Sequence, residues 1–414
     1  MPVDYTALAG PMYFLFIGIE IWASHRGKKG YYRINDSIND MSTGIMMQLG
    51  LLLGASLTVA GYFFIYEYAR VFDLPANSSY VWLACFLSVD IAYYWFHRLS
   101  HEINFLWAAH IVHHQSEEYN LSVALRQSTL QPFFSSVFYW PLALIGFPPE
   151  IFLVCASLNT IYQFWLHTQA IGRLGPLEAF LVTPSHHRVH HGRNPIYIDR
   201  NHGGSLIIWD KLFGTFQKET EPVVYGITKP LNSWNPVWAN IHYWVELFQA
   251  ARRTRNFYDK VRVFLKPPGW LPEDLGGLQL PQPIQTVIKY DPDYPTQLGF
   301  YVLTQFAMLT AMTMGLVYFS TTLGEFGKLV VIVAIAWGLL NLGGLLECQR
   351  WSLISEVCRV VALPLVSLIM FSGVIAWVLC ILLSLATLTF VMQVYPNQTW
   401  FKVRVHQATS TDQE

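Results

Sequence analysis

The chain has 414 residues, of which 53% are hydrophobic and only 13% are charged. Soluble domains carry roughly 25% charged residues, so this composition argues against a soluble protein and indicates one that resides in lipid. The formal net charge of −1 gives no reason to expect a nucleic-acid partner.

Long uncharged runs predict membrane-spanning helices. Each has about the length needed to cross a bilayer, and they occupy residues 5–24, 45–66, 80–96, 298–321 and 328–346, with a further long run at 359–394. Two shorter runs, 132–147 and 150–168, flank a pair of prolines and predict a helical hairpin that enters the membrane and returns.

Charge near the first run predicts the orientation in the membrane. Cations between residues 25 and 33 place that loop in the cytoplasm, because short cytoplasmic loops are enriched in lysine and arginine. If the helices cross alternately, His97 and the polar segments after it face the cytoplasm. The sequence therefore predicts a multi-pass integral membrane protein whose functional residues lie on the cytoplasmic side.

The predicted fold is an all-α polytopic membrane bundle with a histidine-rich di-metal cap. We expect a catalytic membrane domain over residues 1–262 and a connector rich in proline and glycine over residues 263–297. Residues 298–414 would form a C-terminal transmembrane block.

Histidines are concentrated in one part of the chain. Ten of the 14 fall between residues 97 and 191. Side chains three or four residues apart share a helix face, so each cluster can direct several imidazoles to one point. The clusters comprise His97 and His101, then His110, His113 and His114, then His167 alone, then His186, His187, His190 and His191.

Buried imidazoles without partners are costly, so a metal-free cluster is the weaker interpretation. Imidazole suits zinc, copper, iron and nickel, and the residue type alone does not choose among them. Zinc sites usually close with four ligands, and eight to ten histidines exceed one such site. A dinuclear redox centre fits better, and iron is the natural metal for oxygen chemistry.

The order of the clusters, His-x3-His, His-x2-His-His and His-x2-His-His, resembles the fatty acid hydroxylase and sterol desaturase superfamily. So do their contexts at residues 90–98 (DIAYYWFHR) and 207–216 (IIWDKLFGTF). Within the superfamily, residues 118–128 (EYNLSVALRQS) and 183–195 (TPSHHRVHHGRNP) are more similar to the alkylglycerol monooxygenase family. The extra C-terminal membrane block extends this resemblance over nearly the whole chain.

The resemblance implies a set of metal ligands. Those that match the superfamily motifs are His97, His101, His110, His113, His114, His187, His190 and His191. The superfamily usually adds a histidine from the hairpin region, so His167 is expected as a ninth ligand. His186 is left open, as is His202, which stands where the family pattern has tyrosine.

Two acids are candidates for the catalytic machinery. Asp90 precedes His97 by seven residues in an apolar helix, and an acid within a membrane span is a functional candidate by default. We expect its carboxylate to accept the free ring N–H of His97 or a neighbour. Glu102 matches an acidic position of the alkylglycerol monooxygenase pattern, where it would support a ligand or contact the pterin. Asp199 and Asp210 are further candidates for orienting ligands.

The predicted function is a non-haem di-iron monooxygenase that uses O2 on a C–H bond of a lipid from the bilayer. The resemblance implies two Fe ions, tetrahydrobiopterin as reductant, and cleavage of an O-alkylglycerol ether to a fatty aldehyde and a glycerol derivative. No dinucleotide or iron–sulfur motif is present, so electrons come from that donor or from an external reductant protein. The alternatives are a sterol, carotenoid or fatty-acyl hydroxylase or desaturase and, in another class, a membrane metal transporter or sensor.

Overall fold

A computed structural model describes residues 9–281, 287–320, 323–370, 381 and 385. Over these residues the regular structure is helical, with two isolated β-bridges that join Leu181 to Leu206 and Gly192 to Tyr225. The all-α prediction is therefore confirmed. Part of the apolar run at 359–394 lies outside the described residues.

The described chain divides into two compact units. The first contains residues up to 231 together with 239–289, and the second contains 232–238 and the residues from 290 onward. The domain limits expected at 262 and 297 stay a prediction, although one division falls inside the expected connector.

The first unit contains the histidine clusters. Its longer helices are α2 (Gly10–Arg26), α3 (Ile34–Ala69), α4 (Ser79–Glu102), α6 (Gln131–Ile145) and α7 (Pro149–Phe164). Its other helices are α5 (Asn104–His114), α8 (Pro184–His190), α9 (Ile208–Leu212), most of α10 (Pro236–Arg253) and α11 (Phe257–Leu265), with 3-10 turns η1 (Val123–Leu125), η2 (Gly175–Ala179) and η3 (Glu273–Leu275).

The longer helices form because apolar residues recur along them, and they pack through small side chains. A cluster of buried residues from α3, α4, α6 and α7 includes Val89, Leu142 and Ile151. In α3, Gly61 lies against Trp140 of α6, and a Cβ there would come within 2.9 Å of the indole Nε1. Glycine is therefore needed for this close helix approach.

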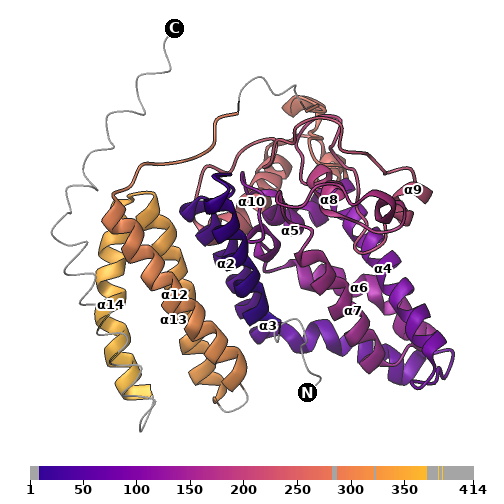
Figure 1. Cartoon of the computed structure of the whole chain (residues 1–414), viewed down its shortest axis with the longest axis horizontal. Helices are drawn as coiled ribbons and strands as arrows, with labels where there is room; N and C mark the ends of the chain where they lie inside the picture. Colours follow the sequence, from indigo (N-terminus) through magenta and orange to yellow (C-terminus); the bar gives the residue numbers. More distant parts are fainter. Residues whose placement is uncertain (1–8, 282–286, 321–322, 371–380, 382–384, 386–414) are drawn as a thin grey trace. The chain divides into compact units, whose positions relative to one another are not determined.

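The short helices gather at one end of the longer ones within the first unit (Figure 1). There α5 packs with α10 and α11 through Ala108, Leu247, Ala250 and Val263, all of which are buried. The Asn104 side chain donates to the carbonyl of Val263 at 2.9 Å, which fixes α11 beside the start of α5. This end of the unit supplies a rigid frame for the histidines of α4, α5 and α8.

The second unit is built from α12 (Thr296–Phe319), α13 (Glu325–Leu346) and α14 (Arg350–Met370). By length and hydropathy, α12 and α13 can each cross a bilayer, and a bent pair within α3, Ile34–Gly54 and Val59–Ala69, is a third candidate. Two to three of the described helices thus meet the criteria for spanning, while other predicted runs form helices that fall short of them.

A network of buried polar side chains joins the three helices of the second unit. Arg359 of α14 pairs with Glu356 at 2.6 Å and donates to Gln305 of α12. Glu356 also accepts from Tyr301 of α12 and from Asn341 of α13. The ion pair therefore links all three helices, and each charge is neutralised where water is absent.

Candidate metal centre

Nine histidines converge from four parts of the first unit. His97 and His101 lie one turn apart on α4, and α5 supplies His110, His113 and His114. The loop that follows α7 provides His167. The last three, His187, His190 and His191, come from α8 and its C-cap.

The nine imidazoles form two separate groups of possible metal ligands. Within each group the ligand atoms all lie within 4.8 Å of one another, and every member is buried. The first histidine group contains His97, His101, His110, His114 and His190. The second histidine group contains His113, His167, His187 and His191. These are the same nine residues that the sequence predicts as ligands, so the fold brings every one of them into a possible site.

The distances between ring nitrogens are those of neighbouring ligands on one ion. For metal–nitrogen bonds of about 2.1 Å, two ligands at a right angle are about 3.0 Å apart. In the first histidine group, Nε2 of His110 and His114 are 3.2 Å apart. In the second histidine group, Nε2 of His167 lies 3.2 Å from that of His113 and 3.0 Å from that of His187.

The opposite ring nitrogens identify the tautomers. In five of the nine residues Nδ1 faces an oxygen that can only accept, so Nδ1 carries the proton and Nε2 is left as the donor to a metal. The pairs are His97 with the carbonyl of His202 at 2.8 Å, His110 with Oε1 of Gln131 at 2.7 Å, and, all at 2.9 Å, His113, His167 and His190 with the carbonyls of Arg126, Gln163 and Arg200.

Several buried ring nitrogens in the two groups lack any hydrogen-bond partner among the described residues. They are Nε2 of His97, His101, His190 and His191, and Nδ1 of His187. A buried polar atom left without a partner costs about 1–3 kcal/mol. Ions held at the two groups would satisfy the four Nε2 atoms, so the residues present fit a two-metal centre.

Burial lowers the pKa of most of these imidazoles and so favours the neutral form, which is the form that binds metal. It lowers the pKa of His110 to about 3, with a further contribution from the neighbouring His101. Burial and the adjacent rings also hold the pKa of His114, His190 and His191 well below the usual value. The site is therefore ready to accept cations at neutral pH.

Asp90 has a different role from the one expected. Its carboxylate accepts from the backbone N–H of Ser205 at 2.7 Å and of Leu206 at 3.1 Å, from Trp209 Nε1 at 2.8 Å and from Asn159 Nδ2 at 2.6 Å. The prediction that it accepts a ring N–H from His97 or a neighbouring histidine is wrong. The loop at residues 202–206 stands between them, and Asp90 acts on that ligand only by fixing the loop.

The same loop is fixed from its other side by Asp210. Its carboxylate accepts from the backbone N–H of His202 at 2.7 Å and of Gly203 at 2.8 Å. A Cβ on Gly204 would lie 2.8 Å from Tyr93 Cδ1 and 3.1 Å from Asp90 Oδ1. The loop therefore needs glycine to pack closely enough for the carbonyl of His202 to reach His97.

The remaining candidates lie around the centre. Glu102 belongs to neither histidine group; its side chain is 41% exposed and pairs with Arg98 at 2.8 Å. Asp199 lies beside the first histidine group, with its Oδ1 3.5 Å from Nδ1 of His101. His186, left open by the sequence, is buried outside both groups, and its Nδ1 lies 3.4 Å from Thr183 Oγ1.

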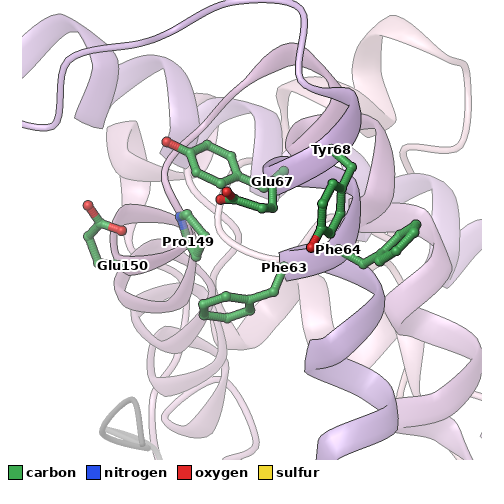
Figure 2. Close-up of a pocket in the computed structure, with 7 residues that line it drawn as sticks. Phe63, Phe64, Glu67, Tyr68, Pro149 and Glu150 are labelled. Carbon is green, nitrogen blue, oxygen red and sulfur yellow. The ribbon is translucent and has the colours of Figure 1, made fainter.

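A hollow elsewhere on the first unit does not involve these residues. It is lined by aromatic residues and Glu67 near the end of α3, and by Pro149 and Glu150 at the start of α7 (Figure 2). None of the nine histidines lines it. We therefore do not assign it to the metal centre.

Comparison with known proteins identifies the family. The chain is 40% identical over 360 residues to alkylglycerol monooxygenase of Homo sapiens, a match that covers 86% of this chain and 81% of that relative. The chain belongs to the alkylglycerol monooxygenase family. It is also 43% identical to the alkylglycerol monooxygenase of Xenopus tropicalis, over 75% of this chain and 70% of the relative.

More distant comparisons agree with this membership. The fatty acid hydroxylase family matches residues 82–215, which include all nine histidines. An ornithine lipid hydroxylase of Rhizobium tropici is 31% identical over 32% of this chain and 40% of its own length. No solved structure matches the chain.

Membership in the alkylglycerol monooxygenase family and the apolar helices establish a lipid-acting membrane monooxygenase. The predicted superfamily, the enzyme class and the lipid-directed oxidation are confirmed. The relatives are enzymes, so the comparisons favour the monooxygenase over the alternative of a metal transporter or sensor.

Proposed function

We propose that this chain is a di-iron monooxygenase that cleaves the ether bond of O-alkylglycerols with O2 and tetrahydrobiopterin. The observation that carries the proposal is the pair of buried histidine groups in a chain similar, over most of its length, to alkylglycerol monooxygenases. The centre faces the cytoplasm, as the charge of the first loop predicts, and the protein crosses the membrane several times.

The overall reaction balances with an external two-electron donor. One oxygen atom of O2 is inserted into the C–H bond next to the ether oxygen, and the other leaves as water after it takes up two electrons and two protons. The resulting hemiacetal collapses to a fatty aldehyde and a free glycerol hydroxyl. Tetrahydrobiopterin supplies the electrons.

The first histidine group would hold one iron and the second histidine group the other, each through neutral imidazole nitrogens. When bound, the pair of ions supplies O2 activation and the abstraction of hydrogen from carbon. The protein positions the ligands and excludes water. His97, for example, is oriented through Nδ1 by the carbonyl of His202, whose loop is held by Asp90 and Asp210.

We assign the reductant-facing role to Glu102. It directly follows His101 and, unlike the buried acids Asp90 and Asp210, reaches the surface, where it can meet a molecule from the cytoplasm. A carboxylate can accept paired N–H donors, and the pterin ring offers such donors. Replacing Glu102 with Gln should raise the concentration of tetrahydrobiopterin needed for half-maximal rate and leave the metal content unchanged.

The decisive experiment supplies detergent-purified protein with a 1-O-alkylglycerol, tetrahydrobiopterin and O2, and measures the fatty aldehyde as a hydrazone. A 1-acylglycerol of the same chain length is the matched control, because its ester lacks the ether-linked CH2. The proposal predicts aldehyde from the ether alone and none without O2. A hydroxylated lipid without aldehyde would instead identify a lipid hydroxylase.

A further inference from the structure

His202 shares the distinguishing feature of the predicted ligands although it lies outside both histidine groups. Seven imidazole nitrogens among the described residues are buried without a hydrogen-bond partner. Five belong to the two groups, and the other two are Nδ1 and Nε2 of His202. A fully buried imidazole with neither nitrogen satisfied needs a partner that the described part of the chain does not supply.

The position of His202 indicates which partner is missing. Its ring centroid lies 5.1 Å from that of His101 and 5.7 Å from those of His97 and His190. All three neighbours belong to the first histidine group. The ring of His202 therefore borders this group on the side formed by α4 and α8.

The main chain of His202 is fixed by hydrogen bonds, whereas its ring makes none among the described residues. The backbone N–H donates to Asp210 at 2.7 Å, and the carbonyl accepts from Nδ1 of His97 at 2.8 Å. The nearest carboxylate oxygen to the ring is Oδ1 of Asp210, 3.8 Å from Nδ1, which is too far for a hydrogen bond. A rotation of the side chain toward the first histidine group would thus break no hydrogen bond.

We propose that His202 supplies a sixth nitrogen ligand to the ion held by the first histidine group. Five imidazoles already converge there, against four in the second histidine group. The first ion would then be surrounded by imidazoles, and exchangeable positions would remain on the second ion. This proposal rests on the two-metal centre of the proposed function and adds an asymmetry between its two ions.

The test uses Co2+ as a spectroscopic probe in the full-length protein. Metal-free wild type, His202→Phe and the matched control His186→Phe are each loaded with two equivalents of Co2+. His186 is a suitable control because it is buried outside both groups and its Nδ1 already faces Thr183. The readouts are the bound cobalt per chain, the visible absorption and the rate of release to a chelator.

The expected result separates His202 from the control. Visible absorption of Co2+ increases when six-coordination is lost, so His202→Phe should absorb more strongly than wild type and release one of its ions about tenfold faster or more. His186→Phe should match wild type in both measurements. Since phenylalanine could disturb folding, His202→Gln is measured in parallel. Each variant must elute as a single monodisperse peak in gel filtration before it is compared with wild type.

Two failures are distinguishable. Wild type could bind two cobalt ions while the folded variants His202→Phe and His202→Gln have the same absorption and release rate as wild type. In that case His202 is not a ligand and this inference is overturned. If wild type itself binds no cobalt, the two-metal centre fails and the proposed function fails with it.

Discussion

Asp90 and Glu102 lie on the same helix, α4, and their replacement should have very different consequences. The four donors to Asp90 divide evenly between its oxygens: Ser205 N–H and Asn159 reach Oδ1, and Leu206 N–H and Trp209 reach Oδ2. In Asp90→Asn, one carboxylate oxygen is replaced by an NH2 group, which cannot accept a hydrogen bond. Two of the four donors then have no acceptor.

The magnitude follows from those two lost bonds. A buried donor left unsatisfied costs about 1–3 kcal/mol, so Asp90→Asn should destabilise the protein by about 2–6 kcal/mol. The 202–206 loop would also loosen, and His97 would lose the carbonyl that orients its ring. Glu102→Gln removes only a partly exposed i,i+4 ion pair with Arg98, a change worth about 0–1 kcal/mol.

The assay is thermal unfolding in detergent, followed by fluorescence-detected gel filtration, together with elemental analysis of the purified variants. Asp90→Asn should unfold at a temperature lower by about 5 °C or more and retain less metal, whereas Glu102→Gln should match wild type. An Asp90→Asn protein with unchanged melting and full metal content would refute the assignment of Asp90 as the support of the loop.

Four further outcomes are expected. His114→Gln should lose the first ion and His187→Gln the second, so elemental analysis should find one metal per chain in each variant and not two. The metal-free protein should be most stable above about pH 6.5 and lose stability as the pH falls toward 3. The reason is that His110 has a folded pKa of about 3 and the unfolded chain, with its ordinary value of 6.5, binds the proton first; a melting temperature independent of pH over this range would contradict this. Arg126→Met should cost about 3–5 kcal/mol, read as a lower melting temperature, because it leaves a fully buried aspartate without its ion-pair partner. Arg359→Leu should destabilise the second unit by a similar amount, and simultaneous replacement of both members of its ion pair by apolar residues should restore much of the loss.

The clustered histidines and the family resemblance together predicted the nine residues that converge, and His167 was expected from the resemblance alone. His97 and His101 share one face of α4 because they are four residues apart, and His110 and His114 share one face of α5 for the same reason. The division into two groups was not predictable. It separates the neighbours His113 and His114, whose rings diverge on the helix, and it depends on how α5 packs against α8 and the loop after α7.

The groups that orient the ligands were missed for a physical reason. Four of the five ring N–H groups described above donate to main-chain carbonyls, which every residue type possesses, so no residue letter signals them. Asp90 was recognised as important, but its partner was misassigned. Spacing within α4 placed it under His97, and only the tertiary fold shows the 202–206 loop inserted between the two.

The membrane block was predictable in outline only. Hydropathy indicates the apolar helices α12 and α13, both of which are long enough to span a bilayer. The polar network around Arg359 was invisible to hydropathy, because a single charge in an apolar run says nothing about its partners. Glu356, three residues earlier on α14, and Gln305 of α12 meet it only in the folded unit.

The central claim is that two separate histidine groups hold two iron ions. Its most direct test is elemental analysis of the purified wild-type chain after anaerobic reconstitution with Fe2+, with a variant in which His114 and His187 are both replaced by Gln as the control. The two groups predict two irons in the wild type and a large loss from both sites in the double variant. Wild-type protein that is folded, reconstituted and still without tightly bound iron would contradict the claim.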